Sequence, residues 1–157
     1  MTKLRSLIIA LGIALFMVGA FFANQADMAA MQSNSSAAGL TGMEKLAQNS
    51  VPYQKALNDG KPTLLEFYAD WCTTCQAMAP LISDFHHRYG EEIDFVTINI
   101  DDPQWRGLIK EYRVTGVPQF EFLDSQKEVT RTLVGRVPEM IFNEQLLRII
   151  GRETNKS

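Results

Sequence analysis

The 157-residue sequence contains only two cysteines and two histidines. Two cysteines form at most one internal disulfide, and Cys72 and Cys75 stand three positions apart in the chain. A loop this short restricts the unfolded chain too little to stabilise a fold. We therefore expect the cysteine pair to have a chemical purpose.

An excess of positive charge is also lacking. The chain has 15 basic and 18 acidic residues, a net charge of −3. Its first 30 residues hold Lys3, Arg5 and Asp27, so the remainder has 13 basic and 17 acidic residues and a net charge of −4. This balance gives no indication of a nucleic-acid-binding face. An apolar content of 46% and a charged content of 21% exclude disorder throughout the chain, and the length suits one domain with an appendage.

A segment without charge occupies the N-terminal region, from Leu7 to Ala23, after Lys3 and Arg5. As a helix its 17 residues would rise about 26 Å, near the lower limit for crossing a bilayer core. No good small-x-small cleavage site follows it directly, so we expect residues 1–23 to form a retained membrane anchor or an uncleaved signal. A cleaved signal peptide is the open alternative. Under either interpretation the basic residues before the segment place the rest of the chain outside the cytoplasm.

The next segment, residues 24–49, is rich in Ala, Ser, Asn, Gln and Gly and has no sustained apolar period. It is predicted to be a flexible linker, and residues 24–41 taken as a random coil would reach roughly 25 Å. The folded domain is then expected over residues 50–157.

Alternating helical and strand patterns follow in that domain. Strands are predicted over residues 64–68, 95–100, 119–123 and 129–134, the last two joined as a hairpin. Helices are predicted over residues 53–58, from Cys72 to Gly90 with Pro80 inside, and over residues 105–112 and 140–150. This order describes an α/β sandwich around a mixed sheet.

The two cysteines belong to the motif Trp71-Cys72-Thr73-Thr74-Cys75, where a strand gives way to a helix. Unpaired backbone N–H groups and the helix dipole at such a position stabilise a thiolate, so Cys72 is the expected nucleophile. One helical turn brings Cys75 beside Cys72. It is the expected resolving thiol, which attacks a mixed disulfide formed at Cys72.

A carboxylic acid, Glu66, lies six residues before Cys72 in an otherwise apolar strand. Burial would raise its pKa towards neutrality, and Glu66 would then relay a proton to or from Cys75. The alternative is that Glu66 faces solvent at a strand edge or pairs with a basic group.

A zinc site would need the two histidines, His86 and His87, in addition to the two cysteines. Adjacent helical residues diverge by about 100°, so these two side chains do not converge readily on one ion. We expect no metal and no cofactor other than the redox-active Cys72–Cys75 disulfide, and we expect the histidines to lie on a solvated helix end.

Three segments together resemble thioredoxin: EFYADWCTTCQAMAP (Glu66 to Pro80), FVTINIDD (Phe95 to Asp102) and VTGVPQFEFLD (Val114 to Asp124). The resemblance covers about residues 50–150. It implies a thioredoxin fold, a three-layer sandwich with a central mixed sheet of four to five strands between helices. Together with the N-terminal apolar segment, it points to the membrane-anchored thioredoxin-like proteins of cyanobacteria and their plant counterparts facing the thylakoid lumen.

The same resemblance implies a substrate-docking surface. A cis peptide bond is expected between Val117 and Pro118, where the backbone would pair with an extended substrate strand. Trp71, Val134 and Gly135 would complete the surface. For Trp71, Val117 and Val134, the alternative is simple core packing.

A disulfide reductase outside the cytoplasm is the function that the resemblance implies, anchored by a single span and facing the periplasm or the thylakoid lumen. Its partners would be a membrane thiol carrier as electron donor and protein disulfides as substrates, including apocytochrome c during cytochrome b6f assembly. Thr73-Thr74 replaces the usual Gly-Pro, Glu66 replaces an Asp, and Thr97 stands in place of a Lys. These departures leave the direction of electron flow open, so an oxidase or isomerase of exported proteins and a non-catalytic assembly module remain alternatives.

Overall fold

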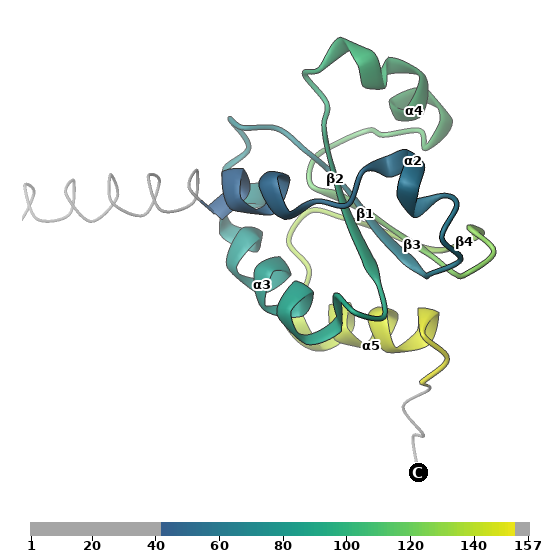
Figure 1. Ribbon diagram of the computed structural model, residues 1–157. Helices are drawn as coiled ribbons and strands as arrows, with labels where there is room; N and C mark the ends of the chain where they lie inside the picture. Colours follow the sequence, from purple (N-terminus) through teal and green to yellow (C-terminus); the bar gives the residue numbers. More distant parts are fainter. Residues whose placement is uncertain (1–41, 153–157) are drawn as a thin grey trace, which may run out of the picture. The chain divides into compact units, whose positions relative to one another are not determined.

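The computed structural model describes residues 42–152 (Figure 1). Every predicted element is present, with bounds within two residues of those expected. Residues 42–49 are helical, and the remaining elements are α2 (Tyr53–Ala56), β1 (Thr63–Tyr68), α3 (Thr73–Tyr89), β2 (Asp94–Asn99), the 3-10 helix η1 (Pro103–Trp105), α4 (Arg106–Glu111), β3 (Gln119–Leu123), β4 (Val129–Val134) and α5 (Glu139–Ile149).

The strands form one mixed sheet in the order β2-β1-β3-β4. β1 pairs with β2 in parallel, whereas β1 with β3 and β3 with β4 are antiparallel. The predicted mixed sheet is therefore confirmed, with four strands. Its central strand β1 is buried along its whole length, so both of its faces must be covered.

Helices cover the two faces of this sheet: α3 and α5 lie on one side, and α2 and α4 on the other (Figure 1). Successive side chains of β1 point to opposite faces. Leu64 and Tyr68 join the core under α3 and α5, whereas Leu65 and Phe67 join the core under α2 and α4. Both cysteines belong to the first of these cores.

The predicted linker is wrong at its C-terminal end. Residues 42–49 are helical, and Met43 and Leu46 are buried in the core that contains the cysteines. Two apolar residues three apart in a polar segment suffice to hold one face of this helix against the domain. A Cβ on Gly42 would lie only 3.2 Å from the Cβ of Ala79 on α3, so the backbone comes close to α3 there.

The rest of the predicted linker, residues 24–41, and the predicted anchor, residues 1–23, lie outside the described residues. Within residues 42–152, no helix combines the length and the apolar character needed to cross a membrane.

Candidate active site

Cys72 caps the N-terminus of α3. Its backbone is extended (φ −80°, ψ 102°), and its N–H donates a hydrogen bond to the Ala69 carbonyl at 3.1 Å. Its sulfur accepts a hydrogen bond from the backbone N–H of Cys75 at 3.0 Å. The sulfur thus satisfies one of the N–H groups that a helix start leaves without an intrahelical partner. The same N–H would stabilise a thiolate at Cys72 after reduction.

Cys72 and Cys75 form a disulfide with their Cα atoms 5.3 Å apart. Cys75 is fully buried, at 0% exposure, whereas Cys72 retains 5%. A thiol on an incoming protein therefore reaches Cys72 more easily than Cys75. This difference suits the predicted division into a nucleophile and a resolving thiol.

Trp71, next to the nucleophile, is 65% exposed. The alternative of core packing is therefore wrong for this residue. The indole Nε1–H donates a hydrogen bond to Oδ2 of Asp101 at 2.8 Å. Asp101 follows β2, which lies beside β1, and its own backbone N–H donates to Oδ1 of Asn99 at 2.9 Å. Asp101 thus holds an exposed aromatic ring in a fixed orientation beside the disulfide.

The peptide bond between Val117 and Pro118 is cis, as the sequence resemblance implied. Pro118 is buried, and its carbonyl accepts a hydrogen bond from the Gly135 N–H at 2.8 Å. Gly135 has a φ of +81°, a conformation that strongly favours glycine. This hydrogen bond ties the residue after β4 to the start of β3.

An apolar hollow of about 500 Å³ lies beside Trp71. Trp71 and Val117 both line it, so the structure brings these two predicted groove residues together. Val134 is 53% exposed and lies near the same wall, since a Cβ on Gly116 would be 3.8 Å from its Cγ1. Core packing is therefore wrong for Val134 as well, whereas Val117 is half-buried and packs against both cores. The lining residues are Trp71, Ile100, Ile109, Val114, Thr115, Gly116 and Val117.

Glu66 is 1% exposed, on the central strand β1, so the solvent-edge alternative is wrong. By strand alternation its side chain lies on the same face as Leu64 and Tyr68, in the layer that contains both cysteines. Neither of its carboxyl oxygens has a hydrogen-bond partner, which also excludes the ion pair. Burial raises the pKa of Glu66 to about 8. At neutral pH it is therefore mostly protonated and ready to exchange that proton.

The two histidines differ in their surroundings. His87 is exposed, as expected, but His86 is half-buried and its ring packs against Phe95, with the ring centroids 5.0 Å apart. Burial lowers the pKa of His86, and the neighbouring His87 lowers it further. In the part of the chain that the structure describes, no group of three or more His, Cys, Asp or Glu residues is placed to hold a metal ion.

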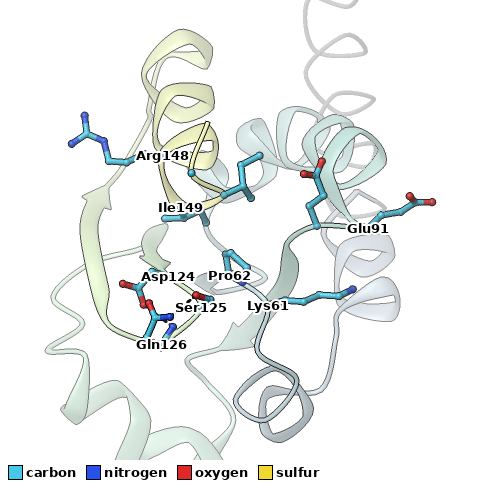
Figure 2. Close-up of a pocket in the computed structure, with 11 residues that line it drawn as sticks. Lys61, Pro62, Glu91, Asp124, Ser125, Gln126, Arg148 and Ile149 are labelled. Atoms are coloured by element: carbon cyan, nitrogen blue, oxygen red, sulfur yellow. Dashed lines mark hydrogen bonds between the residues drawn. The ribbon is translucent and has the colours of Figure 1, made fainter. Parts of the chain in front are cut away.

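A second hollow of about 600 Å³ lies at the opposite end of the sheet, before the start of β1 and beside the turn that follows β3 (Figure 2). In Figure 2 the side chain of Arg148 points away from Lys61 and Pro62. The hollow includes neither cysteine and mixes both charges. It therefore lies away from the disulfide, which follows the other end of β1.

Sequence reasoning missed Asp101, which orients Trp71, and a buried polar pair on β3, Gln119 and Glu121. These two residues are only 2% and 1% exposed. Gln119 and Glu121 alternate with phenylalanines in QFEFL, a pattern typical of a strand with one face in solvent. The helices on both faces of the sheet were the signal that both polar side chains would be buried.

Comparisons with known proteins agree with this geometry. Residues 43–146 match the family described as Thioredoxin. The chain is 37% identical over 111 residues, 71% of its length, to the thiol:disulfide interchange protein TxlA homolog of Synechocystis sp., of which this covers 62%. It is 36% identical over 115 residues, 73% of its length, to the thioredoxin-like protein HCF164, chloroplastic, of Oryza sativa subsp. japonica, of which this covers 44%.

A solved structure is also similar. The germline-specific thioredoxin Deadhead of Drosophila melanogaster aligns with a TM-score of 0.54 and 26% identity, over 61% of this chain and 90% of that one. The mixed four-stranded sheet flanked by helices is thus a thioredoxin fold. The chain spans only 44–62% of the length of the two curated relatives described above.

Proposed function

Because this chain belongs to the thioredoxin family, as a thioredoxin-like protein of the TxlA and HCF164 type, we propose that it is a protein-disulfide reductase. It is a thiol-disulfide oxidoreductase in which Cys72 and Cys75 carry the exchange. One observation carries the proposal: the disulfide lies at the start of α3, directly after the exposed Trp71 and its apolar hollow.

The proposed reaction moves two electrons in two displacements. In the reduced protein the Cys72 thiolate attacks one sulfur of a substrate disulfide, forms a mixed disulfide and releases the first substrate thiolate, which takes up a proton. The Cys75 thiol then loses its proton and attacks the Cys72 sulfur. This closes the Cys72–Cys75 disulfide and releases the second substrate thiol. The protein dithiol is oxidised, and the substrate disulfide is reduced to two thiols.

Glu66 is proposed to relay the proton that Cys75 must lose: in the ionised fraction, about a tenth of the molecules at pH 7, its carboxylate accepts that proton. A carboxyl group with a pKa of about 8 exchanges protons readily near neutral pH. It occupies the same buried layer as Cys75, where water has little access. A fully buried thiol would otherwise ionise slowly, because burial disfavours its charged form.

The proposed direction of electron flow is supported by the limited stabilisation that the site offers a thiolate. Strong oxidants of this fold owe their high potentials to a stabilised reduced form. Here the residues between the cysteines, Thr73 and Thr74, are neutral, and Cys72 and Cys75 are only 5% and 0% exposed. Apart from the Cys75 N–H at the helix start, burial and these neutral neighbours give the reduced form little electrostatic stabilisation, which favours giving electrons to a substrate.

The proposed setting is a membrane-anchored protein whose domain faces the periplasm or the thylakoid lumen. Its electron donor would be a membrane thiol carrier, and apocytochrome c would be among its substrates during cytochrome b6f assembly. Two observations support this setting: the uncharged segment from Leu7 to Ala23 after two basic residues, and the relatives named as chloroplastic or as thiol:disulfide interchange proteins.

Equilibrium titration of the Cys72–Cys75 pair against a thiol redox buffer tests the direction. We expect a midpoint potential near the reducing end of the family range, about −270 mV rather than about −120 mV. The pure protein should then reduce insulin disulfides with dithiothreitol as donor. A midpoint near the oxidising end would replace the reductase by an oxidase or isomerase. The absence of turnover at any potential would favour the non-catalytic assembly module.

A further inference from the structure

A buried amide and a buried carboxyl group lie side by side on β3, on the face of the sheet away from the disulfide. Gln119 and Glu121 alternate with Phe120 and Phe122, which pack in the core with the two cysteines. Nε2 of Gln119 donates a hydrogen bond to Oε1 of Glu121 at 2.7 Å. Oε2 of Glu121 accepts a hydrogen bond from the Thr132 hydroxyl on β4 at 2.5 Å. Both carboxyl oxygens of Glu121 therefore have partners.

The remaining contacts of the Gln119 amide reach the loop between α4 and β3, residues 112–118. Nε2 of Gln119 also donates to the Tyr112 carbonyl at 3.1 Å, and Oε1 accepts the Thr115 N–H at 3.4 Å. A backbone carbonyl only accepts hydrogen bonds, and a backbone N–H only donates. These partners allow one orientation of the amide, with the nitrogen towards Glu121 and Tyr112 and the oxygen towards Thr115.

This loop forms much of the wall of the apolar hollow. Four of the seven lining residues belong to it, namely Val114, Thr115, Gly116 and Val117, and the cis peptide bond ends it. Its backbone is tied to α4 by a hydrogen bond from the Val114 N–H to the Ile109 carbonyl at 3.0 Å. The Gln119 side-chain amide connects the loop to the sheet through the Tyr112 carbonyl and the Thr115 N–H. Without Gln119 these two backbone groups would need other hydrogen-bond partners.

We propose that Gln119, oriented by Glu121, is a positioning residue that fixes loop 112–118 and so sets how well a protein substrate docks beside Cys72. This inference rests on the proposed function for its activity readout. It assigns Gln119 no contact with the reacting sulfurs. A loosened loop should therefore weaken docking, because ordering a docking loop costs binding free energy, while the exchange chemistry continues unchanged.

The test compares Gln119→Met with the wild-type full-length chain, using insulin as the protein disulfide and hydroxyethyl disulfide as a small one. Methionine keeps the length of the side chain but has no amide. We expect the KM for insulin to rise about tenfold with kcat changed less than about twofold. Turnover of hydroxyethyl disulfide and the midpoint potential of the Cys72–Cys75 pair should stay at wild-type values, because neither depends on the loop.

Two further comparisons separate positioning from folding. Glu121→Gln keeps an oxygen that accepts from Gln119 and should retain the wild-type KM, whereas Glu121→Met removes that acceptor and should raise the KM. The comparison of Glu121→Gln with Glu121→Met tests the positioning role even if Gln119→Met does not fold. Thr132→Val removes the other hydrogen bond of Glu121 without touching Gln119, so its KM should match that of the wild type. Equal KM values in Glu121→Gln and Glu121→Met, or a rise in Thr132→Val as large as that in Gln119→Met, would overturn the inference.

Hydrogen exchange tests the same inference without an activity. The Thr115 amide should exchange about tenfold faster in Gln119→Met or in Glu121→Met, while the Cys75 amide, which donates to the Cys72 sulfur, keeps its wild-type rate. Unchanged exchange at Thr115 would contradict the proposal. Wild-type protein that fails to reduce insulin would instead count against the proposed function and leave this measurement decisive for the loop.

Discussion

Replacing Glu66 with methionine is expected to raise the free energy of unfolding of the oxidised protein by about 3 kcal/mol at pH 7. The ordinary pKa of a glutamate is 4.5, and burial raises the pKa of Glu66 to about 8 in the folded protein. At pH 7 folding must therefore return a proton to a group that is ionised in the unfolded chain. Methionine carries no charge and adapts to irregular apolar space, so the variant avoids this cost.

The gain should depend on pH in a defined direction. Below about pH 4.5 Glu66 is protonated in both the folded and the unfolded protein, so its raised pKa does not lower the free energy of unfolding. Between about pH 4.5 and 8 the folded protein holds a proton that the unfolded chain has lost, so the stability of the wild type falls as pH rises. The difference between variant and wild type should grow across this window and level off above it. Urea unfolding followed by tryptophan fluorescence, with the Cys72–Cys75 disulfide intact, measures it. A difference independent of pH would contradict this account.

Glu121 provides the matched control, because it is as buried as Glu66 but fully hydrogen-bonded. Burial also raises the pKa of Glu121, but its hydrogen bonds from Thr132 and Gln119 lower it. Glu121→Met should lower the free energy of unfolding by about 2 kcal/mol, since Gln119 and Thr132 each lose the acceptor of a buried hydrogen bond and this loss is expected to outweigh the relief of the raised pKa. The two substitutions are the same in chemistry and are expected to differ in sign. If Glu66→Met and Glu121→Met both stabilised the protein, the hydrogen bonds of Glu121 would contribute little to the free energy of unfolding.

A residue that costs stability in the wild type needs another reason to be present. Glu66 has no partner that the fold requires, and its oxygens satisfy no neighbouring group. Its surroundings instead hold its pKa at about 8, where proton exchange with a thiol is fast. The expected cost of about 3 kcal/mol is therefore consistent with the proposed role of Glu66 as proton acceptor for Cys75.

The local features of the site could be predicted from the sequence because their causes are local. Cys72 stands where an apolar strand run changes to a helical period, and this change alone indicates a helix N-terminus. Glu66 stands out as a charged residue inside the apolar run of a strand. The cis bond before Pro118 was implied by the thioredoxin resemblance, since Gly116-Val117-Pro118 by itself indicates only a turn.

Features that depend on contacts between distant segments were missed. Asp101 lies 30 residues after Trp71, and the two meet only because β1 and β2 are parallel neighbours whose ends lie at the same edge of the sheet. Gln119 and Glu121 alternate in β3 like residues of a solvent-facing strand, and only the helices on both faces make them buried. The helix over residues 42–49 was missed because two apolar residues make too weak a period.

The largest effects on activity are expected at the two cysteines, and they should differ in kind. Cys75→Ser leaves the nucleophile but removes the thiol that resolves the mixed disulfide, so the variant should accumulate covalent adducts with substrate proteins through Cys72. Cys72→Ser removes the nucleophile and should form none. Each variant should lose turnover of insulin by about a thousandfold or more, because the two thiols act as a unit. Non-reducing electrophoresis of each variant after incubation with insulin or membrane-envelope proteins shows the adducts.

The expected difference between the two variants depends on how accessible each cysteine is to a substrate. Cys75 is completely buried, whereas Cys72 keeps an exposure of 5%, which gives an incoming disulfide access to it. Adducts of similar yield in the two variants would mean that a substrate also reaches Cys75, and the assignment of nucleophile and resolving thiol would then fail. Adducts confined to Cys75→Ser and released by dithiothreitol would establish that substrates enter at Cys72, the sulfur next to Trp71 and the apolar hollow.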